Sequence, residues 1–204
     1  MAHNNTIFSQ LLKLVPRHEF EVLANKHHAG QKLRRVTRWS QFIAMTLGQL
    51  TGRLSLRDIE DNMKAQSKRL YHLGVRAVAK SSLARMNENQ PCELYKELFG
   101  KLLSRCQSNT PGHKFSFDNK LYSMDASLID LSLKMFPWTR YALGKAAVKL
   151  HVALDHSGLI PAFAAITEGK TSDIEIGRTV NFPKGSIVAV DKGYTDYKWF
   201  KELD

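Results

Sequence analysis

The sequence predicts an α+β protein with an all-α first half and a mixed α/β second half. Apolar residues recur at helical spacing from Thr6 to Cys106. From Val148 to Leu154 they alternate with a period of two, which is typical of a strand with two distinct faces. A segment of turn formers at 108–113 separates the two patterns. We therefore expect two domains, 1–112 and 113–204.

Helices in the first half are indicated by apolar residues three or four positions apart and by start and stop signals. Thr37 and Ser55 stand where N-caps are expected, and Pro16, Gly52 and Gly74 interrupt the pattern. The apolar sets are Ile7, Leu11 and Leu14; Trp39, Ile43, Leu47 and Leu50; Leu56, Ile59 and Met63; and Leu94, Leu98, Leu102 and Cys106.

Positive charge is concentrated in the first half. The chain of 204 residues has a formal net charge of +11 and a pI of about 9.7. Residues 1–118 carry 19 Lys+Arg and 9 Asp+Glu, whereas residues 119–204 carry 11 and 10. Nucleic acid is the commonest partner of such a chain when it lacks membrane features. The alternative is a basic surface that serves only solubility.

Two basic segments of the first half are candidates for nucleic-acid contacts. Segment 31–38 holds a cluster of arginines that suits phosphates, or that forms a charged loop. Segment 70–75 indicates a turn that leads into a helix over 79–87, whose polar face suits phosphates and base edges or is simply solvated. The candidate contacts are Arg34, Arg35, Arg38, Lys80 and Arg85.

Two short apolar runs of the second half each end on an aspartate. Residues 120–125 end at Asp125, and residues 185–191 end at Asp191. Two neighbouring strands that end in carboxylates can hold them on a shared hard cation such as Mg²⁺. A strand-end turn or a helix cap is the alternative for either aspartate alone. The pair in matching contexts predicts phosphoryl-transfer chemistry on nucleic acid.

The other elements of the second half follow from alternation and capping signals. Strands over 148–154 and 159–167 are expected to form a hairpin around a tight turn at 155–158. Ser172 and Glu175 match a capping box at the start of a helix, and residues 195–203 indicate another helix. Asp173 is expected to be a first-turn charge favoured by the helix dipole.

Cations near the acidic strand ends are further candidates for nucleic-acid contacts. The segment 136–141 sets aromatic residues beside cations, which suits stacking on an unpaired base or, alternatively, covering the sheet. His151 shares a strand face with one of these cations and is expected to be structural. The candidates are Arg140, Lys145, Lys149 and Lys192.

The order of these elements resembles the ribonuclease-H-like core shared by DDE transposases and retroviral integrases. The phrases that carry the likeness are Met124–Asp130, Ala147–His151, Thr167–Asp173 and Val190–Tyr194, with Phe8–Leu12, Leu54–Ile59 and Leu70–Gly74 in the first half. They are similar to the insertion-sequence-four transposases, which have a Tyr-Arg-Glu-Lys signature downstream. The resemblance implies an all-α DNA-binding domain followed by an incomplete ribonuclease-H-like catalytic core.

The resemblance also implies the site. Asp125 matches the first catalytic, metal-binding carboxylate and Asp191 the second, with Mg²⁺ or Mn²⁺ as cofactor. The third acid, a glutamate on a later helix, has no counterpart before Asp204, so the chain is expected to be the amino-terminal portion of a transposase. Glu202 and Asp196 follow the second aspartate too closely to replace it.

The expected function is that of an insertion-sequence transposase that binds double-stranded DNA at transposon ends and target and catalyses metal-dependent strand cleavage and transfer. The family assembles on paired ends, which implies a homodimer. The alternative is a catalytically inactive, truncated protein that binds DNA or acts as a dominant-negative inhibitor. The sequence has no apolar run long enough for a membrane span, and a cytoplasmic, nucleoid-associated location is expected.

Overall fold

The computed structural model describes residues 6–30, 32–108, 112, 114–131, 140–142 and 145–203. The chain divides into two compact units, Met1–Leu102 and Leu103–Asp204, and each is described by itself. The boundary expected at 108–113 lies mostly outside the described residues. Within the described residues, no helix has the length and apolar character that crossing a membrane requires.

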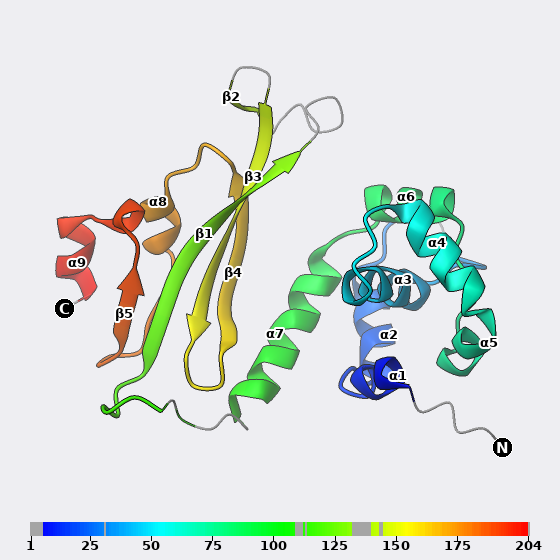
Figure 1. Cartoon of the computed structure of the whole chain (residues 1–204), viewed down its shortest axis with the longest axis horizontal. Helices are drawn as coiled ribbons and strands as arrows, with labels where there is room; N and C mark the ends of the chain where they lie inside the picture. The colour runs from blue at the N-terminus through cyan, green and yellow to red at the C-terminus, as the bar shows by residue number, and fades with distance from the viewer. Residues whose placement is uncertain are drawn as a thin grey trace. The chain divides into compact units, whose positions relative to one another are not determined.

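The first unit is helical, as the apolar spacing predicts. Its elements are α1 (Ile7–Leu12), α2 (Arg17–Lys26), α3 (Arg38–Leu50), α4 (Leu56–Ala65), α5 (Ser67–Leu70), the short 3₁₀ helix η1 (Tyr71–Leu73), α6 (Lys80–Asn89) and α7 (Glu93–Ser108) (Figure 1). The sequence did not single out α2, which begins directly after Pro16. Proline is tolerated there because the first backbone N–H groups of a helix have no intrahelical partner.

Both predicted N-caps of this unit are confirmed. The Thr37 hydroxyl accepts a hydrogen bond from the Ser40 N–H at 3.1 Å and begins α3. The Ser55 hydroxyl accepts one from the Asp58 N–H at 3.1 Å and begins α4. Each cap satisfies one of the unpaired donors at the helix start, a contribution of about 1 kcal/mol.

An aromatic and aliphatic core holds the helices of the first unit together. Phe20 of α2, Ile43 of α3 and Met63 of α4 have no exposed surface. The rings of Phe20 and Trp39 meet edge to face with centroids 5.1 Å apart. Most of the apolar residues that recur at helical spacing in the sequence are therefore residues that the helices bury against one another.

In its described residues, the second unit is a five-stranded sheet with two short α-helices and one 3₁₀ helix. The strands are β1 (Leu121–Leu131), β2 (Arg140–Ala142), β3 (Lys145–Asp155), β4 (Ile160–Glu168) and β5 (Ile187–Val190), and the helices are α8 (Asp173–Gly177), the 3₁₀ helix η3 (Lys192–Tyr194) and α9 (Tyr197–Leu203) (Figure 1). The path runs β2-β3-β1-β5, with β4 also paired to β3. The predicted hairpin is the antiparallel pair of β3 and β4.

One face of this sheet is covered by the short helices. Met124 of β1 and Ala153 of β3 oppose each other and are 2% and 0% exposed. They pack in one cluster with Tyr194 and with Trp199 of α9. Since side chains alternate along a strand, the neighbours of Met124 on β1 point away from this cluster.

Three details of the second unit differ from the sequence prediction. Strand β1 does not end at Asp125 but continues to Leu131, and β5 ends one residue before Asp191. Ser172 occupies the N-cap position of α8, but its side chain makes no capping hydrogen bond, so the capping box is wrong. With only five residues, α8 gains little from a cap, and tertiary contacts described below hold it instead.

A buried carboxylate anchors the β3–β4 turn. Asp155 is 1% exposed, accepts a hydrogen bond from the Ser157 N–H at 2.7 Å and pairs with the Lys120 ammonium at 3.1 Å. Burial alone raises the pKa of the Asp155 carboxyl, but the hydrogen bonds from Ser157 and Lys120 outweigh it, so the net pKa is lowered. The charged form therefore contributes to the stability of the folded unit.

Replacing Asp155 by Asn is expected to lower the free energy of unfolding by about 1–3 kcal/mol at neutral pH, because a buried acceptor loses its charge. A lowered folded pKa gives stability that is present above the ordinary value of 3.8 and is lost as the pH falls through the folded pKa. When the pH is lowered below 3.8, the free energy of unfolding measured with urea should therefore decrease less in Asp155→Asn than in the unmodified chain. The exposed Asp130→Asn is the control, and equal effects of the two substitutions would contradict the assignment.

Candidate active site

Strands β1 and β5 bring Asp125 and Asp191 to equivalent positions. The two strands run parallel, and the last paired residues are Met124 and Val190. Asp125 and Asp191 each come one residue later, so both lie at the step where the parallel ladder ends. Paired residues of a parallel ladder point to the same face. The two carboxylates predicted from the sequence therefore lie on one face of the sheet, where the β1–β5 ladder ends.

Both carboxylates are exposed and oriented by local backbone groups. Asp125 Oδ1 accepts a hydrogen bond from the Ala126 N–H at 2.7 Å. Asp191 Oδ1 accepts one from the Gly193 N–H at 3.0 Å and caps η3. These bonds limit the rotamers of the two side chains while leaving carboxylate surface open to solvent.

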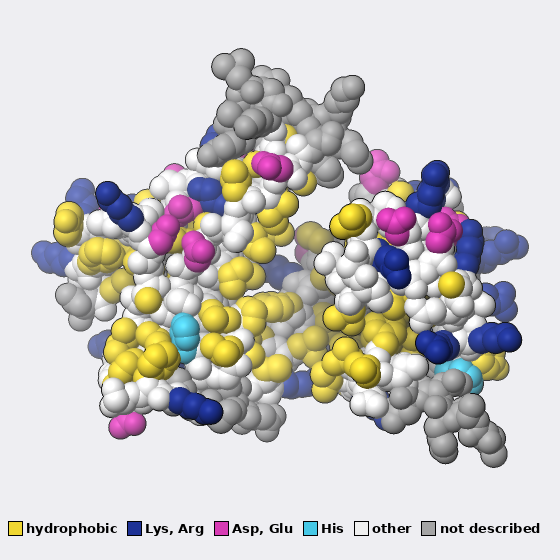
Figure 2. Space-filling view, viewed as in Figure 1, with side chains coloured by type: hydrophobic (Ala, Val, Ile, Leu, Met, Phe, Trp, Pro, Cys, Tyr) yellow, Lys and Arg dark blue, Asp and Glu magenta, His cyan; other side chains and the backbone are white. Residues whose placement is uncertain are grey.

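A third aspartate, Asp173, which the sequence predicted only as a first-turn charge, lies beside the turn that follows Asp191. A Cβ built on Gly193 would lie 2.9 Å from Asp173 Oδ2 and 3.2 Å from Asp191 Oδ1. The turn after β5 therefore packs directly against the start of α8. A side chain at position 193 would push the two carboxylates apart. Figure 2 shows Asp and Glu side chains gathered over the region of β1 and α8.

Lys149 of β3 binds the third aspartate. Its ammonium donates to Asp173 Oδ1 at 2.9 Å and to the Thr171 carbonyl at 2.8 Å, and its side chain is 18% exposed. The sequence predicted Lys149 as a DNA contact. In the structure its donors are directed at the loop before α8, so it fixes that loop and balances one negative charge of the acidic group.

His151 is a buried structural residue, as expected for a strand histidine. It has no exposed surface, and its ring nitrogens lie 3.0 Å from Thr167 Oγ1 and 3.4 Å from the Tyr194 hydroxyl. Burial lowers the pKa of His151, and Lys149 adds to this, while Asp173 at 3.8 Å opposes it. The neutral ring links β3 and β4 to the turn after β5.

The hydroxyl of Tyr194 is buried and is affected by the charges of all three aspartates. Burial raises the pKa of its hydroxyl well above the ordinary range, and the charges of Asp173, Asp125 and Asp191 raise it further. All three carboxylates therefore act on one buried hydroxyl that contacts His151. The hydroxyl stays protonated and can donate a hydrogen bond within this group.

The donor set suits a hard divalent cation only in part. Carboxylate oxygens are the ligands that Mg²⁺ and Mn²⁺ prefer, and Asp125 and Asp191 are open to solvent. Among the described residues, however, no group of three His, Cys, Asp or Glu side chains is placed to hold a metal ion. Asp173 is paired with Lys149. Two carboxylates completed by water ligands are what this chain offers.

The other predicted contacts of the second unit have different surroundings. Lys192 is exposed, directly after Asp191. The side chains of Arg140 and Lys145 and the aromatic segment 136–139 lie outside the described residues.

In the first unit, four of the five predicted nucleic-acid contacts are exposed and one is not. Arg34 and Arg35 lie on the loop before α3, and Lys80 and Arg85 on α6. Arg38, in contrast, is 3% exposed, and its Nη2 donates to the Pro91 carbonyl at 2.7 Å. As the first residue of α3 it turns inward, so the expectation of a surface contact at Arg38 is wrong. Sequence spacing alone did not separate it from its neighbours.

Comparison with known proteins finds a family match in each unit. Residues 3–76 match the family model described as "Domain of unknown function (DUF4372)", and residues 116–204 match "Transposase DDE domain". The chain is similar to the probable transposase for insertion sequence element IS5377 of Geobacillus stearothermophilus, with 25% identity over 114 residues. No solved structure matches.

The alignment covers 56% of this chain and spans 30% of the length of that relative. The matched DDE segment begins just before β1 and contains Asp125, Asp191 and every element that surrounds them. Residues 116–204 are therefore similar to transposase DDE domains, and the chain is similar over 114 residues to part of a probable insertion-sequence transposase.

Proposed function

We propose that this chain acts in DNA transposition, with the helical unit binding double-stranded DNA at the element ends and a ribonuclease-H-like core catalysing strand cleavage and transfer. The observation that carries the proposal is the shared position of Asp125 and Asp191 at the end of the parallel β1–β5 ladder, inside the matched DDE segment. The mixed sheet with β1 between β3 and β5 supports the ribonuclease-H-like assignment.

In this proposal Asp125 and Asp191 are catalytic residues that hold divalent cations, Mg²⁺ or Mn²⁺. Bound there, such ions lower the pKa of a water nucleophile and stabilise the charge that develops on the phosphodiester. The Asp191 side chain is held for this by the Gly193 N–H. Lys149 keeps Asp173 in an ion pair, so that the acidic group carries less uncompensated charge before cations arrive.

DNA is the proposed partner of both units. Lys192 is exposed directly after Asp191, and in this proposal it contacts a phosphate of the strand being cut. Arg34, Arg35, Lys80 and Arg85 are exposed in the helical unit, which carries most of the excess positive charge. The insertion-sequence-four assignment, pairing of two copies on paired ends and a nucleoid-associated location in the cytoplasm complete the proposal.

Cation binding is the first test. In Asp125→Asn and Asp191→Asn we expect the affinity for Mn²⁺ to fall about tenfold or more, because each substitution removes a charged ligand from a site with few ligands. Titration followed by electron paramagnetic resonance measures free Mn²⁺ directly. Asp130→Asn removes a carboxylate of β1 outside the site and is the matched control. Equal affinities in all four proteins would rule out the proposed metal ligands.

Strand cleavage is the second test. The chain is incubated with Mg²⁺ or Mn²⁺ and a supercoiled plasmid that carries the element, and nicking is followed on gels. Any nicking should be abolished in Asp125→Ala and retained in Asp130→Asn. Nicking that persists in Asp125→Ala would falsify the catalytic assignment. Salt-sensitive binding without nicking would restrict this chain to the alternative role of a DNA-binding or inhibitory protein.

A further inference from the structure

A cavity in the first unit brings together three cations from two separate segments. It has a volume of about 280 Å³ and lies between the loop before α3 and one side of α6. Its walls are formed by Lys32, Leu33, Arg34, Val36, Ser82, Arg85, Met86, Asn89 and Gln90. None of these lining residues is acidic, which separates it from the larger cavity on the other side of the same loop, where Glu21 contributes to the wall.

The cations of this cavity are uncompensated. Within the described part of the chain, Lys32, Arg34 and Arg85 form no ion pair. All three are exposed. Cations gathered around one hollow without acidic neighbours raise the local positive potential, which attracts anions. The arrangement therefore indicates an anionic ligand.

Buried polar side chains fix the two walls of the cavity to each other. Gln90, at the end of α6, donates to the Ala29 carbonyl at 2.8 Å and accepts from Arg38 Nη1 at 3.4 Å. Gln41 of α3 donates to Asn87 Oδ1 at 2.6 Å. Arg38 and Gln41 are both 3% exposed. The inward turn of Arg38 thus gives the cavity a defined shape before any ligand binds, which lowers the entropic cost of binding.

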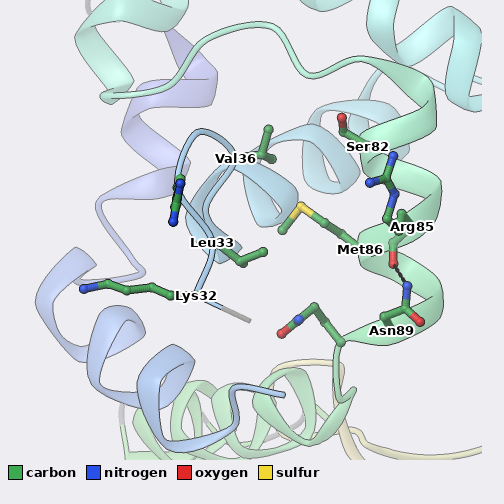
Figure 3. A pocket seen from close by; sticks show the side chains of 9 residues that line it. Lys32, Leu33, Val36, Ser82, Arg85, Met86 and Asn89 are labelled. Carbon is green, nitrogen blue, oxygen red and sulfur yellow. Dashed lines mark hydrogen bonds between the residues drawn. The ribbon is translucent and has the colours of Figure 1, made fainter. Parts of the chain in front are cut away.

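Apolar side chains lie between the two charged sides. Figure 3 shows Leu33 on the loop and Met86 on α6 directed toward the middle of the cavity, with Lys32 on one side and Arg85 on the other. A nucleic-acid strand alternates charged phosphates with a less polar sugar. Arg34 of the loop wall and Arg85 of the α6 wall are the two cations that would bind phosphates, and the apolar residues between them would contact the sugar.

The lining contains no aromatic residue. Unpaired bases are usually held by stacking on aromatic rings. The cavity therefore suits the backbone of a duplex better than an extruded or single-stranded base.

We propose that this cavity is a duplex-backbone site, in which Arg34 and Arg85 bind successive phosphates of one DNA strand and Leu33 and Met86 contact the deoxyribose between them. The inference rests on the proposed role in DNA transposition and assigns the contact to one face of the helical unit. Lys32 assists at the rim. Arg38 holds the walls and does not touch the DNA, and contacts of this kind carry no sequence preference.

The salt dependence of DNA binding tests the site. The probe is a fluorescein-labelled duplex oligonucleotide, and the double variant Arg34→Gln/Arg85→Gln is compared with Arg53→Gln/Arg57→Gln. The control removes the same two charges from exposed positions of the first unit outside the cavity. Each lost phosphate contact reduces the magnitude of the slope of log K against log salt by about 0.9. The slope should therefore become smaller by roughly 2 in the cavity variant and should not change measurably in the control.

Two further binding measurements test whether the contact is with the backbone of a duplex. The loss should be the same on two unrelated duplexes, and it should be smaller on a single strand. An unchanged slope in the cavity variant, or an equal loss in the control, would overturn the site. A loss on only one duplex sequence, or only on single-stranded DNA, would overturn the backbone assignment. Thermal unfolding verifies that each variant is folded. The unfolding temperature should equal that of the unmodified chain, because the replaced arginines are exposed.

This outcome is separable from that of the catalytic proposal. Arg34→Gln/Arg85→Gln should bind Mn²⁺ as the unmodified chain does, and Asp125→Asn should keep the wild-type salt slope. If the slope result fails while Mn²⁺ binding follows Asp125 and Asp191, the cavity proposal alone is wrong. If Mn²⁺ binding is insensitive to both aspartates while the slope falls as expected, the catalytic proposal alone is wrong.

Discussion

The parallel pairing of β1 with β5 is the constraint on which the candidate active site depends. Asp125 and Asp191 are far apart in the sequence, and the register that ends at Met124 and Val190 is what makes them neighbours. A slip of one residue would turn one side chain to the opposite face of the sheet. The burial of Met124 in the cluster with Tyr194 and Trp199 fixes that register, because any slip would expose this side chain.

The loop before α8 then closes the site from one side. Lys149 reaches from β3 to Asp173 and to the Thr171 carbonyl, and Gly193 leaves room for Asp173 and Asp191 to lie close together. The buried His151 of β3 connects Thr167 of β4 to Tyr194. The geometry of the two exposed carboxylates therefore depends on residues that belong to three different elements of the second unit.

The sequence predicted the class of both units because the burial patterns are periodic. Helical spacing, the caps at Thr37 and Ser55 and the alternation along β3 each report a local preference that the fold keeps. The position of the two aspartates was also predictable, since each follows an apolar run. The exact strand ends were not, because Asp125 lies within β1 and only the end of the ladder with β5 marks it.

What the sequence did not show are contacts between residues that lie far apart along the chain. Arg38 looks like its neighbours in a basic run, but its contact with Pro91 exists only once α3 packs against the segment between α6 and α7. Lys149 and Asp173 were interpreted separately as a phosphate contact and a helix-dipole charge, and their pairing joins β3 to α8. The sequence did contain a signal for this pairing: Lys149 and His151 share one strand face, and Asp173 follows the hairpin.

The strands β1 and β5 pair although they are far apart in the sequence, and this affects the order in which the second unit folds. The Asn119 amide donates to the Gly185 carbonyl across a separation of 66 residues, at the open end of this pair. The β3–β4 hairpin, in contrast, closes over a short turn. Contacts between distant segments form late, since chain closure costs entropy before it is rewarded. The β3–β4 hairpin is therefore expected to form before the β1–β5 pairing that brings Asp125 and Asp191 to equivalent positions.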